Sequence, residues 1–438
     1  MPKRLSLRQG LSSVLFWSII SAAFIGPGTV TMASRTGAGF RMQLLWALVF
    51  SILATIVLQE AAARLTIASG KNLGEIVALR FAGQRAARLK WLLFGAVVFG
   101  CAAYQAGNLL GAFSGLALFD DFSRPWATAV LGAICFGFLW IGNYQLIARL
   151  LGFVVAGMGG VFIVVALRAD VTGAELLSGA TMPVIPEGGA LFVVGLIGTT
   201  IVPYNLFLAS GISQGQDMRE MRLGLVLAIL IGGLISVAIM MVGTQVNGPF
   251  SFPALADALG DRLGTWSTVL FGLGLFAAGL SSSITAPLAA AITARSLLGS
   301  DDSGWQVQGR WFRAVWMGVL GVGLLFGLLN VKPIPAIIMA QVVNGVLLPI
   351  IAIFLYVAVN DRALLGRQYA NRPLANLFML LIVGITCFLG LNNIWKAVNN
   401  AFALGLGNNL SVLWVLGLAS VFLVVAVGIR VGRSRIDE

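Results

Sequence analysis

The sequence predicts a polytopic membrane protein built only from α-helices. Of its 438 residues, 59% are hydrophobic and 10% are charged, and the mean hydropathy is +0.96. This leaves too few charged side chains for a soluble protein of this length. Twelve apolar runs are long enough to cross a bilayer, and two of them are interrupted near their centres. We therefore expect a single transmembrane domain, residues 1–438, in which the first and sixth of twelve spans are broken.

The expected spans follow one another without a linker or a soluble domain between them. In the first half of the chain they cover about residues 13–34, 42–65, 91–117, 126–145 and 146–167. In the second half they cover about 190–213, 222–246, 264–292, 314–331 and 335–359, and two more cover about 374–394 and 406–429. This arrangement predicts one repeat over 13–167, a second over 190–359, and two extra helices over 374–429.

The first span is interrupted by residues 26–28, which read Gly-Pro-Gly. Proline removes a backbone donor and glycine weakens a helix, and the bilayer core holds no water to replace the lost hydrogen bonds. Residues 198–205, which read GTTIVPYN, interrupt the sixth span in the same way. Paired breaks in two halves of a chain predict the substrate site of an inverted-repeat transporter. The plainer interpretation is two proline kinks in an ordinary helix bundle.

Membrane topology explains the net charge of +12. With the N-terminus inside, 21 of the 28 Lys and Arg residues fall on the inner side and 7 on the outer side. The positive-inside rule therefore predicts that both termini are cytoplasmic. We also expect a bacterial inner membrane. The basic inner face suits anionic lipid, so we expect the lipid bilayer as a partner and no nucleic acid.

The composition also excludes several kinds of chemistry. The chain has no His, which removes the usual proton relay and the commonest transition-metal ligand. Cys101, Cys135 and Cys387 lie in apolar segments without metal or disulfide spacing, which is typical of packing residues. No nucleophile–base pair, phosphate loop or cofactor motif occurs, so we expect neither an enzyme nor a cofactor.

Several segments resemble the Nramp family of metal transporters. Residues 198–210, GTTIVPYNLFLAS, resemble the family's helix 6 motif around MPHNLYLHS, and residues 26–29, GPGT, occupy the place of its DPGN. Further likenesses in helices 2, 8 and 10 extend the resemblance over the ten-helix core. It implies a leucine-transporter-type fold, an inverted repeat of five plus five helices, with alternating access about helices 1 and 6.

The side chains that hold metal in that family are absent here. The Asp and Asn of DPGN correspond to Gly26 and Thr29, the Met of the helix 6 motif to Val202, and the His after the proline to Tyr204. The pattern is more similar to the Nramp-related magnesium branch, although that branch keeps the Asp that Gly26 lacks. The chain therefore resembles a divergent branch of the family without its metal ligands.

The polar residues expected at the site are uncharged, whereas a dehydrated divalent cation needs anionic or soft ligands. The N–H groups where helix 1 restarts favour an anion, and a Gly-x-Gly in helix 1 holds the substrate carboxylate in amino-acid transporters of the same broad fold. We therefore expect a secondary transporter of a small organic, amino-acid-like solute. The predicted binding residues are Gly26, Gly28, Thr29, Val202, Tyr204, Asn205, Gln341, Asn344, Gln105 and Asn108.

Two features are candidates for ion coupling, by Na⁺ or H⁺. Glu60 is the one carboxylate expected within the membrane, although it also fits a structural partner of Arg64, one turn away. Ser281, Ser282 and Thr285 resemble helix 8 hydroxyls that hold sodium in sodium-coupled relatives of this fold. The competing interpretation is that these hydroxyls bond back to their own helix. Uncoupled transport is the third possibility.

Two other functions stay open. The first is transport of a largely hydrated divalent cation, Mg²⁺ or Mn²⁺, through Thr29, Tyr204, Gln341 and backbone carbonyls. The second is a sensor or a channel that has lost the transport cycle. The paired breaks argue against this second function, because a scaffold has no need for two costly interruptions.

Overall fold

The computed structural model describes residues 25–80, 83–142, 145–299, 303–307, 309–401 and 410–436. Residues 13–24 of the first predicted span and 406–409 of the last lie outside these ranges. Every regular element in the described ranges is a helix, and eleven spans in them are long and apolar enough to cross a membrane. α2 (Pro27–Phe40) continues the first predicted span beyond its break. The all-α membrane fold is therefore confirmed.

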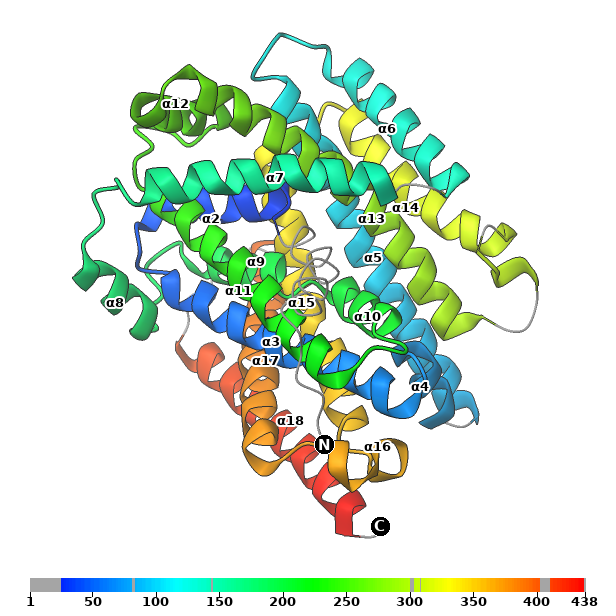
Figure 1. Ribbon diagram of the computed structural model, residues 1–438. Coiled ribbons are helices and arrows are strands. Elements are labelled where there is room, and N and C mark those ends of the chain that lie inside the picture. The colour runs from blue at the N-terminus through cyan, green and yellow to red at the C-terminus, as the bar shows by residue number, and fades with distance from the viewer. Residues whose placement is uncertain are drawn as a thin grey trace.

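The long helices follow the predicted order (Figure 1). In the first half of the chain α2 is followed by α3 (Leu45–Ser69), α5 (Gly83–Leu116), α6 (Arg124–Ile141) and α7 (Gln145–Ala166). The second half holds α9 (Ala190–Thr200), α10 (Pro203–Ile212), α11 (Met218–Gly243), α13 (Thr265–Leu298), α14 (Arg310–Leu328) and α15 (Pro333–Ala358). α17 (Pro373–Ala401) and α18 (Leu410–Ile436) are the two extra helices.

Shorter helices occupy several connections where the sequence predicted no element. They are α4 (Leu73–Arg80), α8 (Gly173–Thr181), α12 (Phe252–Leu263), α16 (Arg362–Tyr369) and the 3₁₀ turn η1 (Ser303–Trp305). Side-chain caps start four of them. Thr172 accepts from the N–H of Glu175 and Ser251 from the N–H of Ala254. Asn72 and Asp361 cap the starts of α4 and α16 in the same way. A search for apolar runs of about 18 residues does not detect such short helices.

Proline marks the point at which each broken span restarts. α9 ends at Thr200 and α10 begins at Pro203, with Val202 as its extended N-cap residue. α2 begins at Pro27, with Gly26 as its extended N-cap residue. Proline suits the first helical position because its missing N–H would have no partner there in any case. The predicted break in the sixth span is confirmed, and the described part of the first span begins at its predicted break.

Glycine lets α2 lie directly on α11. A Cβ atom built on Gly37 would lie 2.0 Å from the carbonyl oxygen of Met240, and one built on Gly243 would lie 2.2 Å from that of Ser34. Side chains at either position would push the two helices apart. α2 is therefore packed backbone to backbone against α11.

At the end of α2, Arg41 connects this helix to the segment around α8. Its Nε donates to Glu175 Oε1 at 2.8 Å, and its Nη2 donates to the carbonyl oxygen of Asp170 at 2.9 Å. The hydrogen bond from Arg41 lowers the pKa of Glu175 below its ordinary value. Because the Arg41 side chain is half exposed, we expect this pair to add little to stability.

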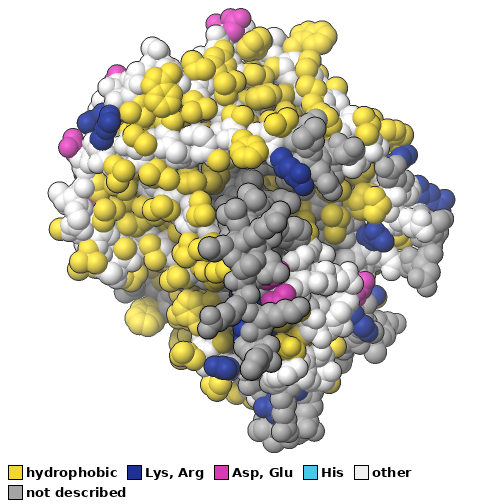
Figure 2. Space-filling model, in the orientation of Figure 1, with side chains coloured by type: hydrophobic (Ala, Val, Ile, Leu, Met, Phe, Trp, Pro, Cys, Tyr) yellow, Lys and Arg dark blue, Asp and Glu magenta, His cyan; other side chains and the backbone are white. Residues whose placement is uncertain are grey.

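The helices at the periphery present apolar side chains outward. Only 28% of the α6 span and 6% of the α18 span are buried within the protein. Hydrophobic side chains cover most of the upper part of the face in Figure 2, over α7 and α12. An apolar exterior of this extent is typical of a surface that contacts lipid.

Candidate functional site

The two helix breaks meet α15 at one junction. Thr29 Oγ1 of α2 lies 3.1 Å from Thr199 Oγ1 of α9. A Cβ atom built on Gly28 would lie 2.3 Å from Nε2 of Gln341, so this side chain rests against the backbone of α2. A Cβ atom built on Gly198 would lie 2.0 Å from the backbone oxygen of Gln341. Three segments that are far apart in the sequence therefore converge on Gln341.

The end of α9 leaves one backbone carbonyl at this junction without its helical donor. Because Pro203 has no N–H, the carbonyl of Thr199 loses the donor that it would have in a continuous helix. The hydroxyl of Tyr104 on α5 donates to the neighbouring carbonyl of Gly198 at 2.9 Å. The C-terminal end of a helix carries a partial negative charge, so exposed carbonyls there favour a cation.

Two buried amide side chains near the breaks have unused hydrogen-bonding atoms. Asn205, in the first turn of α10, is fully buried, and neither Oδ1 nor Nδ2 has a hydrogen-bond partner among the described residues. Oε1 of Gln341 is also buried and has no hydrogen-bond partner among the described residues. A bound water or ion is one way to satisfy buried polar atoms of this kind. No cluster of three or more His, Cys, Asp or Glu that could hold a metal occurs in the described part of the chain.

Three more of the predicted residues line the same region. Gly26 faces α13, because a Cβ atom built on it would lie 3.4 Å from Ser282 Oγ. Val202 is almost fully buried between α9 and α10. The ring of Tyr204 makes an edge contact with the ring of Tyr104, with 5.9 Å between centroids. The structure thus brings these residues together with the junction, and their role in binding stays a prediction.

Three predicted residues lie instead between α5 and its neighbours. Asn344 Nδ2 donates to the carbonyl of Gly100 at 3.3 Å, and Gln105 Nε2 donates to the carbonyl of Ser283 at 3.1 Å. Asn108 is also buried, and its Nδ2 has no partner among the described residues. The bonds of Asn344 and Gln105 are hydrogen bonds between helices, which a packed membrane bundle forms without any substrate. Substrate binding by these three side chains stays a prediction.

The hydroxyls of α13 bond mainly to their own helix. Ser281 Oγ donates to the carbonyl of Ala278 at 3.2 Å, and Thr285 Oγ1 donates to the carbonyl of Ser282 at 3.3 Å. This is the pattern expected of Ser and Thr within a helix, without any ion. These hydrogen bonds form without a sodium ion, so the sodium site stays a prediction.

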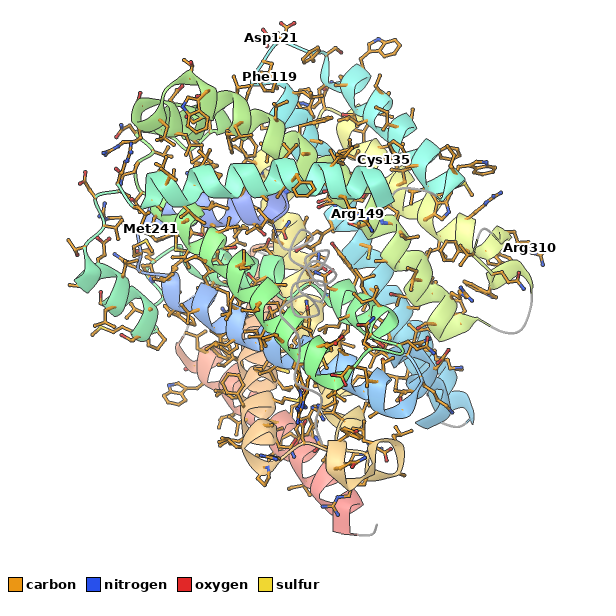
Figure 3. The ribbon with its side chains drawn as sticks, in the orientation of Figure 1. Phe119, Asp121, Cys135, Arg149, Met241 and Arg310 are labelled. Atoms are coloured by element: carbon orange, nitrogen blue, oxygen red, sulfur yellow. The ribbon has the colours of Figure 1, made fainter. Side chains whose placement is uncertain are left out.

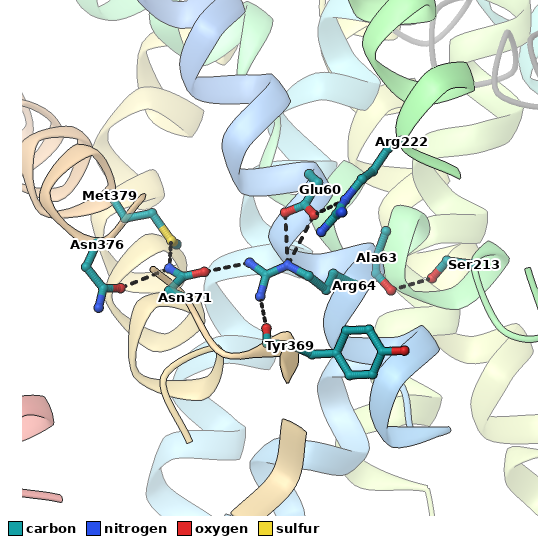
Figure 4. A network of polar contacts seen from close by, with 9 residues as sticks. All are labelled: Glu60, Ala63, Arg64, Ser213, Arg222, Tyr369, Asn371, Asn376 and Met379. Carbon is teal, nitrogen blue, oxygen red and sulfur yellow. Dashed lines mark hydrogen bonds and ion pairs between the residues drawn. The ribbon is translucent and has the colours of Figure 1, made fainter. Parts of the chain in front are cut away.

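Glu60 belongs to a separate network (Figure 4). Its carboxylate lies 3.1 Å from Nε of Arg64 on the same helix and 2.9 Å from Nε of Arg222 on α11. Arg64 also donates to the backbone oxygen of Tyr369 and, at 2.6 Å, to Oδ1 of Asn371. The network joins α3 to α11 and to the segment between α16 and α17. The carboxylate of Glu60 is therefore engaged by two guanidinium groups.

We expect Glu60→Gln to lower the free energy of unfolding by about 2 kcal/mol, because it leaves the buried guanidinium of Arg64 without its counter-charge. The melting temperature of the purified protein in detergent measures this change. Asp121→Asn is the matched control, since it removes one carboxylate from an exposed loop. Equal melting temperatures for Glu60→Gln and the control would show that the network does not stabilise the fold.

Two residues of the junction were not part of the predicted site. Thr199 bonds Thr29 across the junction, and Tyr104 holds a carbonyl at the end of α9. The signal for Thr199 was present, because it stands four residues before Pro203 and its carbonyl is the one that loses a donor. A weaker signal existed for Tyr104, since it is a polar side chain within an apolar span, but its partner is 94 residues away in the chain.

Known proteins resemble this chain over nearly its whole length. The family model described as natural resistance-associated macrophage protein-like, Nramp, matches residues 18–396. A divalent metal cation transporter MntH from Aeromonas hydrophila is 26% identical over 394 residues, which cover 85% of this chain and 93% of the relative. A second, from Yersinia pestis, is 24% identical over 393 residues, covering 85% and 92%.

Solved structures agree with this relationship. The manganese transporter of Eremococcus coleocola superposes with a TM-score of 0.72 at 20% identity, covering 100% of this chain and 97% of that one. MhsT in complex with L-phenylalanine superposes with a TM-score of 0.57 at 16% identity, covering 89% and 98%. The leucine-transporter-type fold is thereby confirmed, and by the extent of the family match this chain belongs to the Nramp family.

Proposed function

We propose that this protein is a divalent metal cation transporter that takes its ion largely hydrated, by alternating access about α2 and the α9–α10 pair. The observation that carries the proposal is the junction itself. There, buried hydroxyl and amide oxygens lie beside the C-terminal end of α9, where the two broken spans meet. The names of the relatives support it, since these are divalent metal cation transporters and a manganese transporter.

The prediction of an organic, amino-acid-like substrate is wrong. It is overturned by relatives named divalent metal cation transporter MntH that match 85% of the chain. The physical reason lies at Gly28, where the predicted site needed open space above the backbone for a carboxylate. The amide of Gln341 occupies that space, within 2.3–2.8 Å of where a Cβ atom would lie. A Gly-x-Gly sequence alone does not reveal which group fills the gap above it.

The ligands at the junction decide which cations are favoured. Neutral amide, hydroxyl and carbonyl oxygens offer too little charge to strip a divalent ion of its water, so the ion keeps most of its shell. Mg²⁺ dehydrates reluctantly and accepts oxygen ligands, and Mn²⁺ accepts the same ligands. Val202 offers no sulfur, which removes any preference for softer ions. We therefore propose Mg²⁺ or Mn²⁺ as the substrate.

The coupling proposal follows from the distribution of titratable groups. The chain has no His, and Glu60 is held by two arginines. We propose that the ion moves down its own electrochemical gradient, without a coupled proton or sodium ion. We also propose cytoplasmic termini, which the distribution of Lys and Arg supports. A bacterial inner membrane is proposed as well, and the bacterial relatives support it.

Uptake into proteoliposomes that contain a metal-sensitive dye tests this proposal. Mg²⁺ and Mn²⁺ should enter the vesicles, and a pH gradient or a sodium gradient should not change the initial rate. Asn205→Ala should lower kcat/KM about tenfold, because the ion loses a buried oxygen ligand worth about 1.4 kcal/mol.

Asn392→Ala is the matched control, since Asn392 is also buried with an unpartnered Oδ1 but lies on the extra helix α17. Its uptake rate should match that of the wild type. Vesicles that accumulate neither cation would overturn the proposed function. A rate that follows the pH gradient, and loses this dependence in Glu60→Gln, would overturn the uncoupled mechanism alone.

A further inference from the structure

A surface at one end of α6 and α14 combines arginine with exposed tryptophan, and nothing in the proposed transport cycle uses it. The guanidinium carbon of Arg313 lies 3.9 Å from the ring centroid of Trp140, so the last turn of α6 lies beside the first turn of α14. Arg310 lies over the ring of Trp311 at 5.2 Å. We call these four residues, with Arg149 near the start of α7, the arginine–tryptophan surface.

The start of α7 lies at the same end of the bundle. Leu151 of α7 packs in the same hydrophobic cluster as Phe138 of α6 and Val315 of α14. Figure 3 shows Arg149 near one end of α7 and Arg310 at the first residue of α14. Arg149, Arg310 and Arg313 therefore all lie on the side of the bundle where α6 ends and where α7 and α14 begin.

The charge of this surface is not balanced within its own elements. The described residues of α6, α7, η1 and α14 include no Asp or Glu. Arg310 takes part in none of the ion pairs of the described residues. Arg124, at the other end of α6, instead donates to the carbonyls of Asn330 and Val331 at 2.9 and 3.2 Å. At that other end the guanidinium is therefore held by two backbone carbonyls, whereas Arg310 has no ion pair among the described residues.

Exposure places the surface at the boundary between lipid and water. Trp140 is 44% exposed and Trp311 47% exposed, on helices whose spans are mostly not buried by protein. Tryptophan is enriched at the headgroup level of membranes, because its ring is apolar and its N–H is polar. Arginine that stacks on an aromatic ring keeps N–H groups available at its edge, which suits phosphate.

We propose that the arginine–tryptophan surface binds the phosphate of an anionic phospholipid of the inner leaflet. Arg149 and Arg310 bind the headgroup, while Trp140 and Trp311 lie against the upper part of the acyl chains. The assignment to the inner leaflet rests on the proposed orientation, in which this end of α6 and α14 is cytoplasmic. Lipid binding itself does not depend on the proposed metal transport.

Native mass spectrometry of the purified protein tests this proposal with phosphatidylglycerol and phosphatidylcholine of the same acyl chains. Phosphatidylglycerol should stay bound at collision energies that remove phosphatidylcholine. Arg149→Gln and Arg310→Gln should each weaken phosphatidylglycerol binding about fivefold, which corresponds to about 1 kcal/mol for one arginine near anionic lipid.

Arg219→Gln is the matched control, because it removes one exposed positive charge at the start of α11, on the same proposed side of the membrane. This variant should bind phosphatidylglycerol as the wild type does. Equal retention of the two lipids would overturn the proposal, as would an equal loss of affinity in Arg219→Gln. Displacement of the lipid by millimolar inorganic phosphate would also overturn it, since the surface would then select a free anion. Both test residues are exposed, so the variants are expected to fold.

Discussion

Replacing Gly198 by Ala should abolish transport and lower the melting temperature by more than any other single methyl addition at the junction. The new Cβ atom would lie 2.0 Å from the backbone oxygen of Gln341 and 2.6 Å from the backbone nitrogen of Gly345. Both are main-chain atoms of α15, so no side-chain rotation relieves the overlap, and α9 has to move away by about 1 Å. That movement would also separate Thr29 from Thr199.

We expect a loss of about 3 kcal/mol or more in the free energy of unfolding for Gly198→Ala. Gly211→Ala is the control, since Gly211 lies on α10, where a Cβ atom added to it would have no atom within 4 Å. It should melt at or slightly above the temperature of the wild type, because Ala favours a helix more than Gly does. Similar melting temperatures and uptake rates for the two variants would mean that α9 and α15 do not pack this closely.

Replacing Gly26 by Asp should raise the affinity for Mn²⁺ about tenfold or more. Gly26 has φ −94°, which any residue adopts, and the atom nearest to a Cβ added there would be Ser282 Oγ at 3.4 Å. A carboxylate therefore fits without displacing backbone. It would place the first negative charge beside neutral oxygens, and an anionic ligand binds a partly dehydrated cation far more strongly than an amide does. Combining it with Val202→Met, which adds a thioether, should favour Mn²⁺ over Mg²⁺ further.

Titration calorimetry with Mn²⁺ and Mg²⁺ measures this change in the purified variants. Gly39→Asp is the control, since it adds the same charge at an open, exposed position on the same helix. It should leave both affinities as in the wild type. If Gly39→Asp and Gly26→Asp raise the affinity equally, the cation does not bind beside residue 26.

The sequence by itself determined the class of protein, the order of the spans and the positions of the breaks. These properties depend on local chemistry, because a bilayer requires about 20 apolar residues for each helix and proline removes a donor wherever it occurs. The pattern of Gly26, Pro27 and Pro203 could therefore be interpreted without any knowledge of neighbouring helices. Short capped helices such as α8 and α12 escaped prediction because their 9 and 12 residues are fewer than a span requires.

The tertiary structure alone decided which polar side chains have atoms left to bind an ion. Asn344 and Asn205 look equivalent in the sequence, yet Nδ2 of Asn344 bonds a carbonyl on α5 and only its Oδ1 has no partner among the described residues, whereas both amide atoms of Asn205 have none. The predicted ion pair between Glu60 and Arg64 is present. The second hydrogen bond to Glu60 comes from Arg222, which is 162 residues away in the chain. The substrate prediction failed for the same reason, because Gln341 reaches Gly28 from a distant helix. A hydrogen-bond partner supplied by a distant helix leaves no periodic signal in the sequence, so only the packed bundle assigns it.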